Sequence, residues 1–298
     1  MSQDQQTHCG YVALVGRPNV GKSTLMNHVL RQKISITSRR PQTTRTNVLG
    51  IDTEDQFQAI YLDTPGIHNK TSKALNRYMV NSATTAARQV DVLVMVIEAG
   101  RWTEEDEAVF KLCQAQSGKC LAVLTKIDLL DNKEVLLPEL ARLGELNYFS
   151  EIVPVCALKQ EGLDDVRQVV FKHLPEGPHF FSEDEVTDQT ERRMVEEIIR
   201  EKLMRQLGDE IPHNAAVVVE KFEDDKTITR IYADIYVERD SQKRIVIGKS
   251  GSRMKLIGIE ARKDIELLLQ RRVSLNLWVR VKKGWSNSPA LMRRLGYD

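Results

Sequence analysis

The residues that could do chemistry begin with a glycine-rich loop near the N-terminus. Residues 16–23 read G-R-P-N-V-G-K-S, which matches the phosphate-binding pattern G-x-x-x-x-G-K-[ST]. The glycines let backbone N–H groups turn toward phosphate oxygens, and the N-terminus of the following helix favours negative charge. Lys22 is expected to reach the outer phosphates, and the Ser23 hydroxyl to bind Mg²⁺. The residues expected around the phosphates are Gly16, Arg17, Pro18, Asn19, Val20, Gly21, Lys22, Ser23 and Thr24.

A second candidate element, Asp63-Thr64-Pro65-Gly66, follows the apolar run 58–62. A carboxylate at the tip of a buried strand can hold Mg²⁺, and the backbone N–H of Gly66 can reach a γ-phosphate. The D-x-x-G pattern is common by itself. Its position 40 residues after Ser23 makes it strong support for a P-loop NTPase.

A switch loop is expected in the segment 41–46, which reads P-Q-T-T-R-T. We expect Thr44 to close onto Mg²⁺ and the γ-phosphate, with Thr43 as the alternative. The surrounding segment 35–47 is polar and basic, which is typical of a loop that orders when a triphosphate binds. The predicted metal ligands are therefore Ser23, Thr44 and Asp63.

The base-binding residues are expected in Thr125-Lys126-Ile127-Asp128, which follows the apolar run 121–124. Guanine presents two N–H donors that one carboxylate, Asp128, can accept, whereas adenine offers no such pair. The stem of Lys126 can lie along the base. This [NT]-K-x-D pattern more often begins with Asn, so the Thr125 hydroxyl predicts weaker nucleotide affinity.

The next candidate, Cys156-Ala157-Leu158, follows the apolar run 152–155. Guanine-specific GTPases usually have Ser at the first of these positions, and the backbone N–H of Ala157 is expected to contact guanine O6. That contact needs no particular side chain. Cys156 is interpreted either as part of this site or as an inert buried cysteine.

The catalytic step lacks one familiar group. Ras-type GTPases place a glutamine directly after D-x-x-G to orient the attacking water, and here Ile67 occupies that position, so intrinsic hydrolysis is expected to be slow. Similarity to potassium-activated GTPases implies that Asn19 helps to hold a K⁺ ion near the transferred phosphate. His68 is interpreted as an exposed loop histidine rather than a general base. The expected catalytic residues are Asn19, Lys22, Thr44 and Gly66.

A second glycine motif lies near the C-terminus, where residues 245–254 read I-V-I-G-K-S-G-S-R-M. In KH domains such a G-x-x-G loop brings the backbone close to a nucleic acid. Residues 241–298 contain 14 Lys or Arg and 4 Asp or Glu, whereas the rest of the chain contains 29 and 38. This asymmetry indicates a polyanionic partner for the C-terminal part. The residues expected at RNA are Ile247, Gly248, Lys249, Ser250, Gly251, Ser252, Arg253 and Lys255.

The elements that must position these residues divide into two groups. Apolar runs alternate with helix-like stretches up to residue 174, which predicts an α/β domain with a mostly parallel sheet. A helix from about Asp188 to Leu207, ending at Gly208, begins a smaller α+β domain of the order α-β-β-α-β, assigned to the type II KH fold. We expect residues 1–176 to form the GTPase domain, 177–187 a linker and 188–298 the KH domain. In the latter, Trp278 and Trp285 could stack on bases; core packing is the favoured role for Trp278, and the role of Trp285 is left open.

Composition limits the other classes of protein. No apolar run reaches the roughly 18 residues that a membrane span needs, and residues 1–9 lack the apolar stretch of a signal peptide. The four cysteines show no C-x-x-C pair, which favours a reduced, cytoplasmic protein without structural zinc.

A P-loop GTPase domain, a short linker and a C-terminal KH domain, in this order, resemble the Era family of bacterial GTPases. The resemblance extends from Gly16 to the C-terminus. It implies a Mg²⁺-dependent GTPase, with K⁺ as a further candidate ion. It also implies a nucleotide-gated monomer that binds the 3′ end of small-subunit ribosomal RNA and assists assembly of that subunit. The departures from the family pattern are Thr125 and Cys156, and contact with the inner face of the membrane is an alternative that nothing here requires.

Two other functions fit parts of the sequence. If the protein is an RNA-binding assembly factor in which GTP turnover is incidental, ribosome assembly is expected to survive Lys22→Ala. A tRNA-modification GTPase shares the P-N-x-G-K-S and T-T-R features, but that family carries its extra domains N-terminal and ends in cysteine, whereas this chain ends in Gly296-Tyr297-Asp298. A double-GTPase ribosome factor is excluded because the full pattern G-x-x-x-x-G-K-[ST] occurs only once, at residues 16–23.

Overall fold

Alternating apolar and helical segments produce the two units of this computed structural model, which describes residues 6–38, 40, 42–67, 74–116, 118–130, 132–207, 215–225, 227–295 and 297. Unit 1 contains most of the chain up to Asp188, and unit 2 contains the chain from Gln189 together with short earlier segments. The predicted boundaries at residues 176 and 188 stay a prediction.

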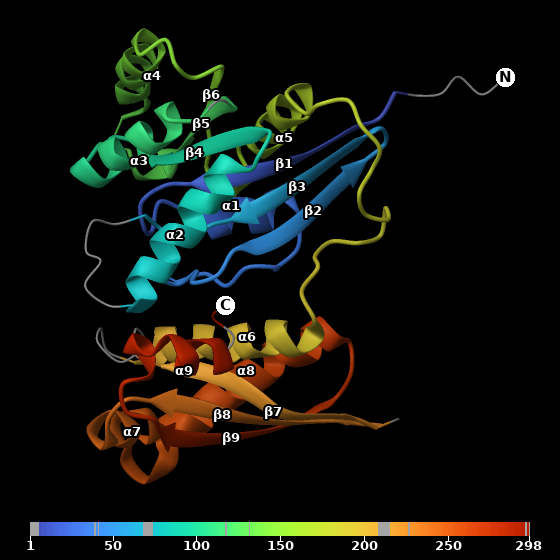
Figure 1. Cartoon of the computed structure of the whole chain (residues 1–298), viewed down its shortest axis with the longest axis vertical. Coiled ribbons are helices and arrows are strands. Elements are labelled where there is room, and N and C mark those ends of the chain that lie inside the picture. Colours follow the sequence, from blue (N-terminus) through green and yellow to red (C-terminus); the bar gives the residue numbers. More distant parts are fainter. Residues whose placement is uncertain are drawn as a thin grey trace, which may run out of the picture. The chain divides into compact units, whose positions relative to one another are not determined.

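Unit 1 is built on a six-stranded sheet of order β2-β3-β1-β4-β5-β6 (Figure 1). The strands are β1 His8–Val15, β2 Val48–Glu54, β3 Phe57–Asp63, β4 Val92–Glu98, β5 Lys119–Thr125 and β6 Glu151–Pro154. Every pairing is parallel except that of β2 with β3, which confirms the mostly parallel sheet. The sequence analysis missed β2, because its apolar residues are interrupted by Gly50 and Asp52 on an antiparallel edge strand.

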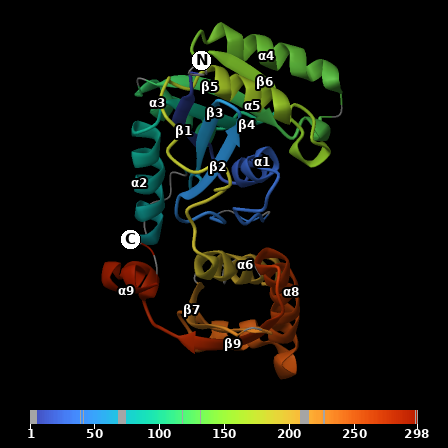
Figure 2. The same cartoon turned by 90° about the vertical axis from the view of Figure 1, so that its right-hand side faces the viewer.

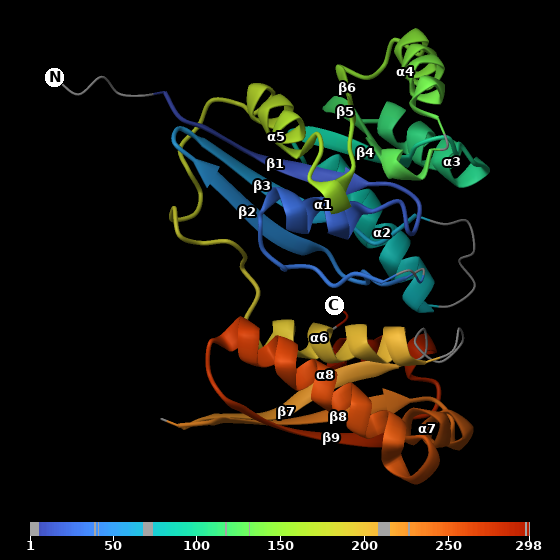
Figure 3. The same ribbon diagram turned by 180° about the vertical axis from the view of Figure 1, so that it is seen from behind.

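Helices cover both faces of this sheet. On one face, α1 Lys22–Val29 and α5 Leu163–Lys172 share a core with residues such as Leu14 and Val94 (Figure 3). On the other face, α2 Ala74–Arg88, α3 Glu104–Gln114 and α4 Leu136–Glu145 share a second core with Met95 and Leu124 (Figure 1). The parallel strands therefore end at one edge of the sheet, and the loops that follow them can form a common site.

Unit 2 has the order α-β-β-α-α-β followed by a short helix. Its sheet, β7-β8-β9, pairs β7 with β8 antiparallel and β8 with β9 parallel. Helices α6 and α8 lie on the same face of this sheet (Figure 2), where their apolar residues share one core with it. The elements are α6 Glu191–Gln206, β7 Ala216–Asp224, β8 Thr229–Val237, α7 Asp240–Ile247, α8 Ser252–Leu269, β9 Val273–Val281 and α9 Pro289–Arg294.

The expected order α-β-β-α-β was wrong by one helix, α7. Its last residues, Ile245 to Ile247, form a short apolar run, and its first turn is polar. The missed signal was Gln242, whose side-chain Oε1 accepts hydrogen bonds from the backbone N–H groups of Glu238 (2.9 Å) and Arg239 (3.0 Å). Gly208, where α6 was expected to stop, lies outside the described residues.

The predicted linker, residues 177–187, is attached to unit 1 by hydrogen bonds. The buried side chain of Gln58 on β3 accepts from the backbone N–H groups of Phe180 (2.8 Å) and Phe181 (3.0 Å) and donates to the Phe181 carbonyl (2.9 Å). Further along, the Thr187 hydroxyl donates to the Leu49 carbonyl on β2 (2.6 Å). The segment therefore follows the antiparallel edge of the sheet.

Replacing Gln58 tests this attachment. We expect Gln58→Ala to lower the free energy of unfolding of unit 1 by about 2 kcal/mol, because it leaves partly buried backbone groups of Phe180 and Phe181 without this partner. Urea unfolding of the full chain measures the change. Gln114→Ala, at an exposed position of α3, is the matched control and should change stability by less than about 0.5 kcal/mol. Equal effects of the two substitutions would contradict the expectation.

Candidate functional sites

The phosphate-binding loop has a backbone that its sequence dictates. A Cβ on Gly16 would lie 2.6 Å from the Val96 carbonyl oxygen, and Gly21 has φ +105°. Asn19 also adopts a positive φ, 65°, which asparagine tolerates better than most residues. The loop leads directly into α1, as the phosphate-binding pattern requires.

Lys22 is buried inside this loop. Its Nζ donates to the carbonyl oxygens of Gly16 (2.9 Å) and Arg17 (3.0 Å). Burial lowers the pKa of Lys22 to about 8, although the Asp63 carboxylate opposes the shift. A polyphosphate beside the ammonium would favour its charged form.

Three oxygen-bearing residues predicted to bind Mg²⁺ lie together. The Ser23 hydroxyl donates to Asp63 Oδ2 (2.5 Å), the Thr44 hydroxyl lies 3.2 Å from the same oxygen, and the two hydroxyl oxygens are 2.9 Å apart. Asp63 Oδ1 is buried without a hydrogen-bond partner among the described residues. Hydroxyl and carboxylate oxygens are the donors that Mg²⁺ prefers, so this cluster fits the ion.

The geometry also separates the two threonine candidates. The Thr43 hydroxyl donates to the Arg40 carbonyl (2.7 Å), whereas Thr44 faces Ser23 and Asp63. Pro41, at the start of the predicted switch motif, lies outside the described residues.

Ser35 is a member of this cluster that the sequence analysis missed. Its buried hydroxyl donates to Asp63 Oδ2 (2.7 Å). Asn27 on α1 holds Ser35 in place, because its Oδ1 accepts from the backbone N–H of Ser35 (2.8 Å) and its Nδ2 donates to the Ser35 carbonyl (2.7 Å). Burial raises the pKa of Asp63, and these hydroxyl hydrogen bonds and Lys22 act in the opposite direction.

The D-x-x-G segment packs against the phosphate-binding loop. A Cβ on Gly66 would lie 2.7 Å from the backbone of Pro18, and the Thr64 hydroxyl donates to the Leu14 carbonyl (2.7 Å). Ile67, which replaces the water-orienting glutamine, is buried in the core that α2 and α3 share. Its side chain therefore cannot contact an attacking water, and His68 lies outside the described residues.

The guanine-binding motif is tied to the phosphate loop through Thr125. Its hydroxyl lies 2.5 Å from the Val20 carbonyl oxygen and 3.0 Å from that of Ile97. One hydroxyl therefore joins the ends of β4 and β5 to the phosphate loop, although the motif lacks the usual asparagine.

Cys156 has a specific partner rather than being an inert core residue. Its thiol donates to Asp128 Oδ1 (3.0 Å), the carboxylate expected to read guanine. Burial and the neighbouring Asp128 raise the pKa of Cys156, so the protonated donor form persists at neutral pH. Ala157 begins the next turn, and the Leu158 side chain is exposed.

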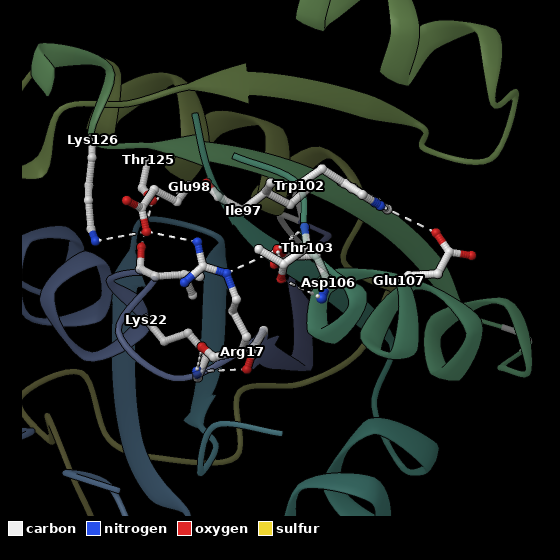
Figure 4. A network of polar contacts seen from close by, with 12 residues as sticks. Arg17, Lys22, Ile97, Glu98, Trp102, Thr103, Asp106, Glu107, Thr125 and Lys126 are labelled. Carbon is white, nitrogen blue, oxygen red and sulfur yellow. Dashed lines mark hydrogen bonds and ion pairs between the residues drawn. The ribbon is translucent and has the colours of Figure 1, made fainter. Parts of the chain in front are cut away.

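The Arg17 side chain binds two carboxylates outside the phosphate-binding loop. Its guanidinium is buried and forms ion pairs with Glu98 (2.8 Å) and Asp106 (3.0 Å), as Figure 4 shows. The side chain is thus engaged by β4 and α3, while its backbone remains part of the loop. Glu98 and Asp106 were missed, because no local pattern marks them.

The G-x-x-G loop of unit 2 joins α7 to α8 through a short 3-10 turn, Lys249–Gly251. Gly248 and Gly251 have φ of +74° and +78°, and a Cβ on Gly248 would lie 2.8 Å from that of Arg253. Lys249, Ser250 and Lys255 are exposed, as a phosphate-contacting loop requires. Exposed apolar residues lie on the helices either side: Ile245, Leu256 and Ile259.

The structure bears on three further residues of unit 2. Arg253 donates to the Ile245 carbonyl (2.7 Å), so in this structure its guanidinium holds the end of α7. Trp278 is 47% exposed and stacks on Tyr232, so its expected core position was wrong. Trp285 is fully buried against Tyr297, which resolves its role in favour of packing.

Comparisons with known proteins match both domains. A family model described as "50S ribosome-binding GTPase" matches residues 11–126, and one described as "KH domain" matches residues 210–286. A P-loop GTPase unit followed by a KH unit is therefore the class of this protein. None of the described helices is long and apolar enough to cross a membrane.

Full-length relatives identify the family. GTPase Era of Pseudomonas fluorescens (strain Pf0-1) is 50% identical over 297 residues, covering 100% of this chain and 99% of the relative. The Azotobacter vinelandii GTPase Era is also 50% identical over the same length. The chain belongs to the GTPase Era family.

Two solved structures cover 98% of this chain and 99% of their own, at 37% identity and a TM-score of 0.94. One is Era in complex with MgGDPNP and nucleotides 1506–1542 of 16S ribosomal RNA. The other is a variant of Aquifex aeolicus Era bound to GDP and AlF4⁻.

The contact between Cys156 and Asp128 generates a prediction. We expect Cys156→Ala to raise the Kd for GDP about three- to tenfold, because the carboxylate loses the donor that orients it. Cys156→Ser supplies a hydroxyl donor and should bind GDP within about twofold of the wild type. Titration of a fluorescent GDP analogue measures both. Wild-type affinity in Cys156→Ala would show that the thiol does not orient Asp128.

Proposed function

We propose that this GTPase is a nucleotide-gated switch that binds the 3′ end of small-subunit ribosomal RNA and assists assembly of the small ribosomal subunit. The observation that carries the proposal is the meeting of Ser23, Thr44 and Asp63 at one carboxylate oxygen, in a chain that also has an exposed KH loop. A threonine from the switch segment then senses the ligand that the phosphate loop holds.

Each residue has a role that follows from its position. The phosphate loop and Lys22 hold the phosphates, and Asp128 accepts from guanine while Cys156 orients it. Ser23 and Thr44 would hold Mg²⁺ with Asp63 beside them, and the bound ion would neutralise charge on the phosphates. Gly66 lies against Pro18, where its backbone N–H can meet the γ-phosphate as the switch closes. On hydrolysis, Thr44 and Gly66 lose the group that they contact, and the switch relaxes.

The proposal includes slow intrinsic GTP hydrolysis and a K⁺ ion bound at Asn19. Because the Ile67 side chain is buried, the chain's own D-x-x-G segment supplies no group to orient water. Asn19 is exposed in the phosphate loop, where its amide oxygen can bind a cation near the transferred phosphate.

The potassium hypothesis is tested by exchanging salts. We expect kcat for GTP hydrolysis to be at least about tenfold higher in KCl than in NaCl at equal ionic strength. Asn19→Gly keeps the positive φ accessible and should abolish this difference, while Asn132→Ala, at an exposed position far along the chain, should retain it. Equal rates in the two salts for the wild type would refute the hypothesis.

The assignment of an RNA partner is based on the solved Era structure that contains ribosomal RNA. That relative covers nearly the whole chain and was solved with a 16S fragment, whereas the model whose description names the 50S subunit matches residues 11–126 alone. We therefore favour small-subunit ribosomal RNA as the partner. We also propose a cytoplasmic location, which the cysteine pattern favours. Contact with the membrane remains a prediction from the resemblance.

Cross-linking to RNA tests the function. The full chain is cross-linked to total cellular RNA with GTP, with GDP and without nucleotide, and the bound RNA is sequenced. We expect enrichment of the 3′ end of small-subunit ribosomal RNA, greatest with GTP, and loss of the nucleotide dependence in Lys22→Ala. Enrichment elsewhere would refute the RNA assignment, and complete assembly activity in Lys22→Ala would refute the switch.

A paired substitution tests the KH loop. Replacing Lys249 and Lys255 by Ala should weaken RNA binding. It should also make the negative slope of log K against log salt shallower by about 1.4, the value for two lost single-strand phosphate contacts. Lys111→Ala with Lys172→Ala, two exposed lysines of unit 1, is the matched control. An unchanged slope would show that the loop lysines do not contact phosphate.

A further inference from the structure

We propose that Arg17 and Glu98 are positioning residues that couple the phosphate-binding loop to the guanine-binding loop. This inference rests on the proposed use of the site for a guanine nucleotide. Neither side chain is assigned to touch the ligand. They act by fixing two loops that the nucleotide must engage at once.

Arg17 is bound through both its backbone and its side chain. Its carbonyl oxygen accepts from Lys22 Nζ (3.0 Å), which aims the lysine that is expected to meet the phosphates. Its guanidinium reaches in the opposite direction, where Nη2 lies 2.8 Å from Glu98 Oε2 and Nε lies 3.0 Å from Asp106 Oδ2. The position of the Lys22 ammonium is thus linked to two carboxylates outside the loop.

Glu98 connects this arginine to the guanine-binding loop. It is the last residue of β4, and its Oε2 also receives the Lys126 ammonium at 3.1 Å (Figure 4). The same oxygen therefore binds a cation from each loop. Burial raises the pKa of Glu98, but hydrogen bonds from Arg17 and Lys126 outweigh it and hold the pKa below its usual value, so the carboxylate is charged at neutral pH.

Lys126 is the residue whose position this bond controls. It has a left-handed backbone, φ 59°, and its side chain is about one third exposed. A lysine side chain has many rotamers, so an unanchored stem would lose much entropy on packing along a base. The bond to Glu98 restricts the stem before the nucleotide arrives, which lowers that cost of binding.

Asp106 explains why position 17 requires arginine. Its side chain is fully buried at the start of α3, where Oδ2 accepts from the backbone N–H (2.9 Å) and hydroxyl (2.7 Å) of Thr103. Glu98 and Asp106 are reached by different nitrogens of the planar Arg17 guanidinium. A lysine presents a single nitrogen and cannot hold both carboxylates in this geometry.

A double-mutant cycle for GDP affinity tests the coupling. The four proteins are the wild type, Arg17→Met, Lys126→Met and the double variant, each as the full chain, titrated with a fluorescent GDP analogue. We expect Arg17→Met to raise the Kd roughly tenfold in the wild-type background but less than about threefold when Lys126 is already absent. Glu98→Gln keeps the side-chain shape and should show the same dependence on Lys126.

Two controls separate positioning from folding. Lys111→Met removes an exposed lysine of α3 whose partner, Glu107, lies 3.9 Å away, and it should change neither Kd nor thermal midpoint. The thermal midpoint of each nucleotide-free variant is measured alongside. If Arg17→Met unfolds the protein, Glu98→Gln with Lys126→Met completes the cycle.

The outcomes distinguish this inference from the proposed function. An equal factor for Arg17→Met with and without Lys126 would overturn the coupling, as would a lowered thermal midpoint with unchanged Kd. Equal affinity of the wild type for GDP and ADP would instead overturn guanine binding itself. Non-additive effects with wild-type selectivity for GDP are the expected result.

Discussion

The buried carboxylate of Asp63 is the constraint on which the nucleotide-binding arrangement depends. It lies at the end of β3 and receives the hydroxyl groups of Ser23, Ser35 and Thr44 on one oxygen. Those hydroxyls come from the phosphate loop and from the segment that follows α1. A charged group without access to water must be satisfied by its surroundings, so these segments converge on it. A divalent cation placed here would bind the same oxygen atoms. A change of ligand at this position would therefore change the contacts of Thr44 in the switch segment.

Most of the nucleotide site could be predicted because its expected residues belong to short local sequence motifs. The phosphate loop, D-x-x-G and T-K-I-D each follow an apolar strand, and the parallel sheet brings their ends to one edge. Ser35, Glu98 and Asp106 could not be predicted, since each acquires its role from residues distant in the sequence. The unexpected elements have local reasons. The β2 strand is interrupted by glycine and aspartate, and α7 is an eight-residue helix whose apolar end resembles a strand. The expected core position of Trp278 was wrong because burial of an aromatic residue on a strand depends on the sheet face that it occupies.

The two departures from the usual guanine-binding patterns are both substitutions that retain a hydrogen-bond donor. Thr125 replaces an amide by a hydroxyl and still reaches the Val20 carbonyl, and Cys156 replaces a hydroxyl by a thiol and still reaches Asp128. A thiol is the weaker donor, but it lies in a buried position where competition from water is small. Each position therefore makes a hydrogen bond although its donor group differs from the usual one.

The charged cluster around Arg17 shows why such a site is built from ions. Burying Arg17, Glu98 and Asp106 costs desolvation energy, and apolar side chains of similar volume would often pack there with equal or greater stability. Apolar packing has no direction, however, and would leave the Lys126 side chain without the carboxylate that restricts its rotamers. The ion pairs of Glu98 with Arg17 and Lys126 instead connect the residue whose carbonyl binds the Lys22 ammonium to the lysine of the guanine-binding loop. The cluster is therefore better explained by the distance between the two nucleotide-binding loops than by the stability of the fold.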